Sequence, residues 1–202
     1  MLAPCCTLKQ FASIALVQEK PCKKAPERKG LNVVTVRNIR IFGDPVLTST
    51  AAPVEVFDHK LETLVQDMLE TMDAAGGVGL AANQIGVLKR VFVFDTTHTE
   101  GGMRGHIINP TWKAIGEETQ LGPEGCLSIP DIQYDVQRAQ DVEVSGVDIY
   151  GKPVTILASG LLARCIQHES DHLDGVLFLK RLSPELRKEA MREIRSAEWF
   201  QQ

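Results

Sequence analysis

Two histidines stand four residues apart, with a glutamate directly after the first, in residues 167–172, which read QHESDH. On a helix, side chains four residues apart differ by about 40° around the axis, so the imidazoles of His168 and His172 leave the same face and can share one metal ion. Glu169 is offset by one residue, which lets it reach a water on the metal without being a ligand. This H-E-x-x-H arrangement is typical of metal-assisted hydrolysis.

The hexapeptide alone also fits a surface helix with two solvated histidines, because so short a pattern occurs by chance. The preceding residues, 160–167, read GLLARCIQ, which predicts a buried helix, and buried ionisable groups need partners. The best candidate for a third ligand is Cys126, since a metal holds a cysteine as its thiolate. A free cysteine taken alone is more often a small buried apolar residue. Together with two histidines on a buried helix, the ligand interpretation is preferred.

A Cys-His-His set leaves one coordination position open for water, as a catalytic site requires, whereas structural zinc sites fill all four positions. A non-catalytic protein with a structural metal site is therefore an alternative, and a fourth protein ligand would support it. A zinc endopeptidase is another, but such enzymes take their third ligand downstream, from a Glu or His. Here Asp174 follows closely, and Glu185 and Glu189 fall in a separate predicted helix.

A stretch rich in glycine and alanine, residues 77–84, reads GVGLAANQ. It lacks the Lys-Ser/Thr of a phosphate-binding loop and follows a helix, so nucleotide binding is not expected. Its small residues suggest a close approach of the backbone to another group, and the Gln84 amide could donate a hydrogen bond to an oxyanion. A tight packing loop with an exposed Gln84 is the alternative.

Composition and charge exclude several classes of protein. Hydrophobic residues make up 44% of the 202 residues and charged residues 24%, and no apolar run approaches the roughly 20 residues of a membrane helix. Residues 1–30 carry six Lys/Arg and two Glu, and the remainder carries 16 Lys/Arg and 24 Asp/Glu. So acidic a body is not suited to general nucleic-acid binding. Five cysteines without the spacing of a disulfide framework indicate a reducing compartment, and we expect the cytoplasm.

The chain divides into an extension and one domain. Residues 20–30 are basic and broken by prolines, so we expect residues 1–32 to be a disordered, dispensable N-terminal extension. Import into an organelle through this extension is an alternative that Glu19 and Glu27 weaken, and a start-site artefact is another. Residues 33–202 are then expected to form a single catalytic domain.

The elements that must position these residues follow from periodicity. Helices are expected over residues 58–75, 160–173 and 184–199. Strands are expected over residues 90–95, 105–110, 141–147 and 152–158, the second ended by Pro110. Short strands without regular crossover helices predict an α+β fold, with antiparallel sheets packed around a central metal-binding helix and a C-terminal helix.

Residues 77–84, 124–128 (EGCLS) and 167–172 resemble, in this order, the three signature motifs of peptide deformylases at every fixed position. The flanking sequences IFGDPVL and LDGVLF are similar as well, and the resemblance covers residues 36–185 of this chain. It implies the peptide deformylase fold and a metal-dependent hydrolase. The implied reaction removes the formyl group from the N-terminal formyl-methionine of newly made polypeptides and releases formate.

The resemblance also implies roles for individual residues. The implied metal ligands are Cys126, His168 and His172. The metal of the family is Fe²⁺, often replaced by Zn²⁺, Ni²⁺ or Co²⁺ in preparations, and all of these suit such a ligand set. Glu169 would carry the proton from the water to the departing amine, while the Gln84 amide and the Leu127 backbone N–H would stabilise the charged formyl oxygen.

Substrate contacts follow from the same resemblance. The implied methionine-pocket residues are Val78, Gly79, Glu124, Leu127 and Cys165. Many bacterial relatives carry an arginine that helps hold the peptide backbone where this chain has Gln133, so the sequence departs from the family at that contact. Arg138 could pair with a carboxylate near the metal, although a surface salt bridge is the commoner arrangement. The last helix could dock on the ribosome as in related enzymes, but four glutamates balance its basic residues.

Overall fold

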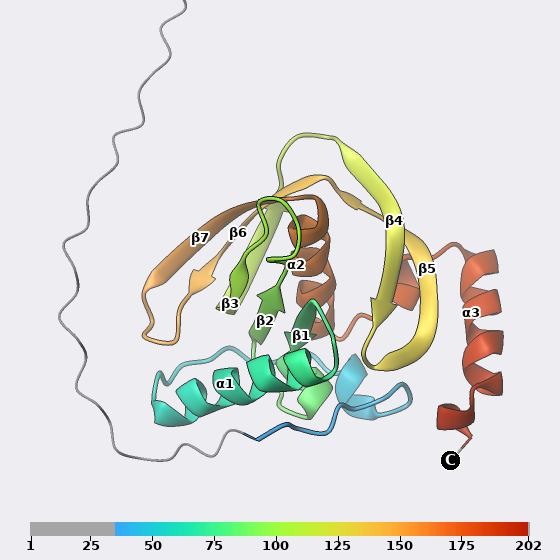
Figure 1. The fold of residues 1–202 in the computed structure, drawn as a ribbon, viewed down its shortest axis with the longest axis horizontal. Helices are drawn as coiled ribbons and strands as arrows, with labels where there is room; N and C mark the ends of the chain where they lie inside the picture. The colour runs from blue at the N-terminus through green and yellow to red at the C-terminus, as the bar shows by residue number, and fades with distance from the viewer. Residues whose placement is uncertain (1–34, 202) are drawn as a thin grey trace, which may run out of the picture. The chain divides into compact units, whose positions relative to one another are not determined.

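Two antiparallel sheets and three helices organise the computed structural model, which describes residues 35–201 (Figure 1). One sheet has five strands in the order β1-β2-β3-β6-β7, and the other is the β4–β5 hairpin. The strands are β1 (Gly79–Ala81), β2 (Val91–Asp95), β3 (Arg104–Ala114), β4 (Thr119–Cys126), β5 (Ile129–Ala139), β6 (Asp141–Val147) and β7 (Pro153–Ser159). The helices are α1 (His59–Ala74), α2 (Gly160–Leu173) and α3 (Pro184–Ser196), joined by short 3-10 helices η1 (Pro45–Thr48), η2 (Ala82–Ile85), η3 (Phe178–Arg181) and η4 (Glu198–Phe200). The expected α+β class with a C-terminal helix is confirmed.

Helix α1 begins and ends where its sequence predicts. The Asp58 side chain accepts hydrogen bonds from the backbone N–H groups of Lys60 and Leu61, which caps the helix. After the last turn, Gly76 adopts a φ of 65°, a conformation that glycine reaches without a Cβ clash. The buried face carries Leu61, Val65, Met68 and Met72, so the methionines fill the core.

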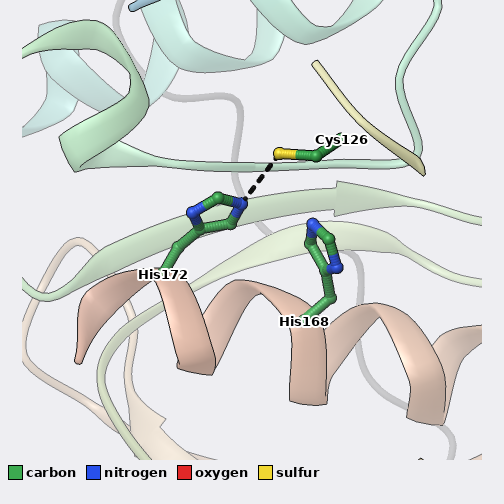
Figure 2. A group of neighbouring side chains, drawn as sticks. All are labelled: Cys126, His168 and His172. Carbon is green, nitrogen blue, oxygen red and sulfur yellow. Dashed lines mark hydrogen bonds between the residues drawn. The ribbon is translucent and has the colours of Figure 1, made fainter. Parts of the chain in front are cut away.

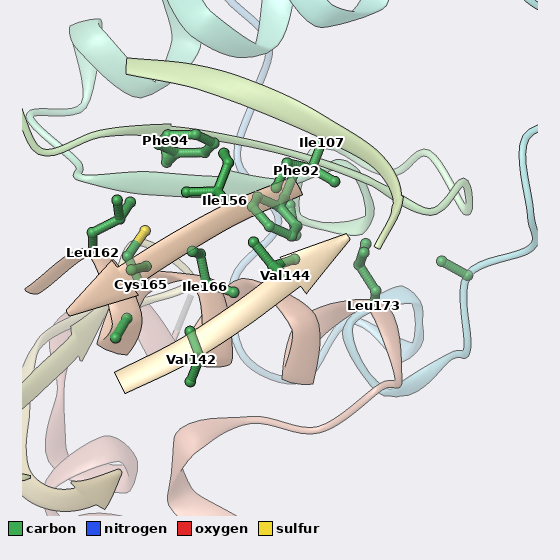
Figure 3. Packing of buried hydrophobic residues seen from close by; sticks show 14 residues of the cluster. Phe92, Phe94, Ile107, Val142, Val144, Ile156, Leu162, Cys165, Ile166 and Leu173 are labelled. Carbon is green, nitrogen blue, oxygen red and sulfur yellow. The ribbon is translucent and has the colours of Figure 1, made fainter. Parts of the chain in front are cut away.

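Strand β2 has helices on both faces. Phe92 and Phe94 point into a cluster with the apolar side chains of α2 (Figure 3). Val91 and Val93 belong to a second cluster, which contains the buried side chains of α1. Successive side chains of a strand point to opposite faces, so α1 and α2 cover opposite faces of the five-stranded sheet. Full burial of each phenylalanine contributes about 1.5–3 kcal/mol, which fixes α2 firmly against the sheet.

Helix α2 is the centre of the fold. All its residues from Leu162 to Leu173 are buried, and the helix contacts both the five-stranded sheet and strand β5 of the hairpin (Figure 1). Its boundaries match the prediction. Because the buried residues include two histidines, a glutamate and an aspartate, these groups must find partners inside the protein.

The β4–β5 hairpin was not predicted. None of the strands expected from the sequence covers it, because its residues include Gly122, Pro123, Gly125 and Pro130, which are typical of turns. Within residues 35–201, β4 pairs with β5 alone, and proline is tolerated in a strand with a free edge because no ladder hydrogen bond is lost. The hairpin carries Cys126 at the end of β4.

Strand β3 runs past Pro110, so the expectation that Pro110 ends it is wrong. The register shifts between Ile108 and Thr111, and Asn109 adopts a φ of 52°. Pro110 therefore sits in a β-bulge, where its missing N–H costs no ladder bond. Helix α3 ends at Ser196, three residues earlier than expected.

The expected extension, residues 1–32, lies outside the described residues, so its separation from one catalytic domain of residues 33–202 stays a prediction. Among residues 35–201, no helix is long and apolar enough to cross a membrane.

Candidate active site

Three side chains that could hold a metal ion meet between the hairpin and α2. Cys126 extends from the end of β4 toward His168 and His172, which rise from the same face of α2 (Figure 2). The Cys126 Sγ atom lies 3.1 Å from His172 Nε2, and the three ligand atoms all lie within 4.8 Å of one another. Ligands around a tetrahedral metal are about 3.5 Å apart, given bonds of about 2.0–2.3 Å. The donor set therefore fits one divalent metal ion.

Cys126, which is half-buried, and Cys165, which is buried, differ in their electrostatic surroundings. Burial raises the pKa of the Cys126 thiol, but the neighbouring His172 and His168 outweigh it and hold the pKa well below its usual value. Burial raises the pKa of Cys165 well above its usual value, and Glu169 and Glu124 act in the same direction. Cys126 is thus suited to act as a thiolate ligand, and Cys165 stays a neutral thiol.

Glu124 holds one of the histidines in place. The Nδ1–H group of His168 donates to Glu124 Oε2 at 3.0 Å, which leaves Nε2 available as a ligand atom. Arg138 donates to both oxygens of Glu124, at 2.7 and 2.9 Å, and Arg164 donates to Oε1 at 2.9 Å. Burial opposes ionisation of Glu124, but the hydrogen bonds from Arg138 and His168 lower its pKa to about 2.

The ion network continues to the surface through Asp171. Arg138 donates to Asp171 Oδ2 at 2.7 Å, and Arg181 donates to both Asp171 oxygens. Arg138 is 5% exposed. The alternative in which it pairs with a carboxylate near the three donors is therefore confirmed, and a surface salt bridge is excluded. Arg164 and Asp171 were not predicted. Both lie in a helix that the sequence predicts to be buried. This position alone could have indicated that they form ion pairs, because a buried charge needs a partner.

A cavity of about 530 Å³ opens beside the three donors. Each implied substrate residue lines it: Val78, Gly79, Glu124, Leu127 and Cys165. Gln84, Cys126, His168 and Glu169 line it as well. His172 does not line the cavity, although its Nε2 faces the Cys126 sulfur. The residues of all three sequence motifs thus converge on one site.

Glu169 places a buried carboxyl group at the wall of this cavity. Its side chain is buried, and Oε2 has no hydrogen-bond partner among the described residues. Burial raises the pKa of Glu169 to about 7, although the nearby His168 and His172 favour the ionised form. A group with a pKa near neutrality can both accept and release a proton during turnover.

Gln84 faces Cys126 rather than solvent. It is 1% exposed, which excludes the exposed-loop alternative. Its Oε1 accepts from the Ala81 backbone N–H at 2.8 Å, while Nε2 donates to Ser128 Oγ at 3.1 Å and contacts Cys126 Sγ at 3.5 Å. These bonds fix the amide with its N–H group toward the site.

The glycines of residues 77–84 allow the close approach that the sequence suggested. A Cβ atom at Gly79 would lie 2.3 Å from Glu169 Oε1 and 2.7 Å from Cys165 Sγ. At Gly77 it would lie 2.7 Å from Leu127 Cδ1. Any larger residue would therefore displace the side chains that line the cavity.

The downstream ligands of a zinc endopeptidase have no counterpart at this site. Glu185 and Glu189 are exposed on α3, and the cluster among the described residues that could hold a metal ion has Cys126 as its third member. The geometry therefore favours the upstream cysteine and not a downstream carboxylate.

Comparison with known proteins agrees with this geometry. The family model described as polypeptide deformylase matches residues 36–188. Peptide deformylase 1 of Corynebacterium efficiens is 64% identical over 167 residues, which cover 83% of this chain and 99% of that protein. A peptide deformylase of Acidothermus cellulolyticus is 54% identical over 82% of this chain and 89% of its own length.

Solved structures show the same fold. The crystal structure of a peptide deformylase from Legionella pneumophila matches with a TM-score of 0.75 and 42% identity, over 83% of this chain and 98% of that one. The Ehrlichia chaffeensis enzyme, solved in complex with actinonin, matches with a TM-score of 0.75 and 40% identity over 81% and 98% of the two chains. The chain therefore belongs to the polypeptide deformylase family, metal-dependent hydrolases that remove the formyl group from the N-terminus of nascent peptides.

Proposed function

We propose that the three converging side chains hold the catalytic metal and that Glu169 is the proton carrier of deformylation. The proposed ligands are Cys126, His168 and His172. The observation that carries this assignment is the approach of their ligand atoms to within 4.8 Å at the wall of a cavity that Glu169 also lines. A metal bound there supplies Lewis-acid polarisation of a water molecule and of the formyl oxygen.

The protein's own groups would manage the proton and the developing charge. Glu169 accepts the proton of the attacking water and delivers it to the departing amine, so the amine leaves neutral. The Gln84 amide and the Leu127 backbone N–H donate to the formyl oxygen as it gains negative charge. The hydrogen bonds from Ala81 and to Ser128 support this role for Gln84, because they hold its amide before substrate binds.

The substrate's methionine side chain would occupy the apolar part of the same cavity. The residues proposed to line or border this methionine pocket are Val78, Gly79, Glu124, Leu127 and Cys165. Both oxygens of Glu124 already accept hydrogen bonds from His168 and two arginines. We therefore assign Glu124 a positioning role at the cavity wall, and leave direct contact with methionine to the apolar members of the set.

The tight glycine loop supports steric selection of the formyl group, whose carbon carries only hydrogen. The test compares release of formate from formyl-Met-Ala with release of acetate from acetyl-Met-Ala. The proposal predicts that the acetyl peptide reacts slower by orders of magnitude, and comparable rates would overturn it. Cleavage of an internal peptide bond instead of formate release would point to a peptidase.

We propose ferrous iron as the resident metal and the cytoplasm as the site of action. The family resemblance supports iron, and a thiolate with two imidazoles suits Fe²⁺ as well as Zn²⁺, Ni²⁺ and Co²⁺. A site of action where ribosomes make formylated chains suits this substrate. Metal analysis of protein purified without oxygen tests the iron assignment, and zinc as the main metal in such a preparation would contradict it.

Contact with the ribosome is proposed through α3. One face of this helix lines a groove of about 460 Å³ with Pro184, Arg187, Lys188, Met191, Arg192 and Arg195. Glu193 lies elsewhere, where it accepts a hydrogen bond from Tyr134 at 2.7 Å. The cations are thus gathered in the groove despite the balanced composition, and such a face attracts RNA phosphates.

Deletion of α3 would be a poor test of this contact, because Ala190 and Ile194 are buried in the core. Replacement of the four groove cations by glutamine removes the charge and keeps the buried face. Weaker co-sedimentation with ribosomes is expected, and unchanged co-sedimentation would remove this proposal.

A further inference from the structure

The rim of the active-site cavity carries one exposed charge. Among the acidic and basic side chains that line the cavity, four are buried, namely Glu124, Arg164, His168 and Glu169. Asp131 is exposed, and its carboxylate has no hydrogen bond or ion pair among residues 35–201. The other exposed lining residues are neutral: Ala75, Gly76, Pro123, Gly125 and Gln133. A ligand entering this cavity therefore meets a negative rim.

The backbone holds Asp131 at this position. Its φ is 63°, in the left-handed region that aspartate and asparagine adopt more readily than most residues. Ile129 and Ile132, on either side, are buried in the cluster that packs the hairpin against the C-terminal segment. The two isoleucines fix the chain, so the carboxylate stays at the cavity mouth.

Formylated peptides bring no charge at their reacting end. The formyl group neutralises the α-amine, and methionine is uncharged, so the first charges that reach the rim belong to the residues after methionine. We propose that Asp131 is a specificity-determining residue that favours substrates with Lys or Arg directly after formyl-methionine and disfavours Asp or Glu there. This inference rests on the proposed function of the cavity.

Gln133 is neutral, so it leaves the negative charge of Asp131 at the rim uncompensated. It lies opposite Gly125 across the hairpin and lines the same cavity. A cation at this position would compensate Asp131. An exposed charge pair changes kcat/KM by about two- to five-fold at low salt, and screening removes the effect as salt rises.

The experiment measures formate release at low and high salt from formyl-Met-Lys-Ala, formyl-Met-Glu-Ala and the neutral formyl-Met-Ala-Ala. The metal-loaded full-length chain is expected to prefer the lysine peptide over the glutamate peptide, mainly through KM, and to lose the preference at high salt. Asp131→Asn tolerates the same backbone conformation and should bring the ratio to about one, as an interaction removed from the bound state requires. Gln133→Lys should lower the ratio as well.

Asp135→Asn is the matched control, because Asp135 is exposed on the same strand but does not line the cavity. It should leave the preference intact. Equal kcat/KM for the lysine and glutamate peptides in the wild type, or an unchanged ratio in Asp131→Asn, would overturn the inference. Failure to release formate from formyl-Met-Ala-Ala would instead count against the proposed function.

Discussion

The Nδ1 atom of His168 lies 3.0 Å from Glu124 Oε2, which joins a proposed metal ligand on α2 to strand β4 two residues before Cys126. This contact orients the imidazole and couples two of the three donors. Outer partners of this kind commonly change metal affinity or activity by about 10- to 100-fold when they are removed.

Glu124→Gln should therefore weaken metal retention. The amide carries one acceptor oxygen in place of two, so it cannot satisfy His168, Arg138 and Arg164 together. We expect faster loss of metal during a challenge with chelator, by about 10- to 100-fold, and a parallel loss of formate release. Glu118→Gln, an exposed residue before β4, serves as the control. Equal metal loss in both variants would show that Glu124 does not position His168.

Arg138→Met should destabilise the protein strongly. The substitution leaves the buried carboxylates of Glu124 and Asp171 with fewer partners, and breaking a buried ion pair costs about 3–5 kcal/mol. Arg104→Met is the matched comparison, because Arg104 pairs with Asp73 and Asp95 near the surface, where such pairs are worth about 0–1 kcal/mol. Urea unfolding of both variants measures the difference, and similar losses would contradict the buried network's importance.

Gly79→Ala should impair catalysis without unfolding the chain. The added Cβ would lie 2.3 Å from Glu169 Oε1, so the carboxylate must move, and a displacement of about 1 Å can cost about 100-fold in rate. Gly105→Ala is the control, since its Cβ meets only the Phe94 ring, at 3.1 Å. The measurement is kcat for formate release with circular dichroism as a check on folding. Normal turnover by Gly79→Ala would show that the Glu169 carboxylate can move away from the added Cβ without loss of activity.

His106 should make stability depend on pH. Burial lowers its pKa despite the opposing Asp148 carboxylate, and Nε2 accepts a hydrogen bond from the Ile149 backbone N–H at 3.2 Å. The pKa of His106 is lower in the folded state than in the unfolded state. The contribution of neutral His106 to the free energy of unfolding is therefore complete above the unfolded-state pKa, and it is lost as the pH falls through the folded-state pKa. His106→Gln should flatten the dependence of unfolding free energy between about pH 7 and pH 5. An identical slope in both proteins would exclude His106 as the cause.

The sequence alone was sufficient for α2 and for the residues of the proposed centre. Local patterns carry that information: an apolar run defines the helix, and the spacing of His168 and His172 defines a shared face. The glycine- and alanine-rich stretch indicated Gln84, the family resemblance then supplied Leu127, and the structure brings both to the cavity wall.

The β4–β5 hairpin and the ion network were less accessible. Pro123 argues against a strand on local propensity, because the sequence does not reveal that β4 has a free edge, where proline is tolerated. The partners of Glu124 are Arg138 and Arg164, 14 and 40 residues away, and only the tertiary fold brings them together. Buried charge alone predicts that partners exist, without identifying them.

The most direct test of the central assignment is a paired measurement on Glu169→Gln, which keeps the side-chain volume and removes the proton carrier. Metal content and the rate of formate release from formyl-Met-Ala-Ala are measured on the same anaerobic sample. The account predicts metal content equal to that of the wild type and a fall in kcat of about 10²- to 10⁴-fold. Near-normal turnover with full metal content would contradict it, because another group would then move the proton.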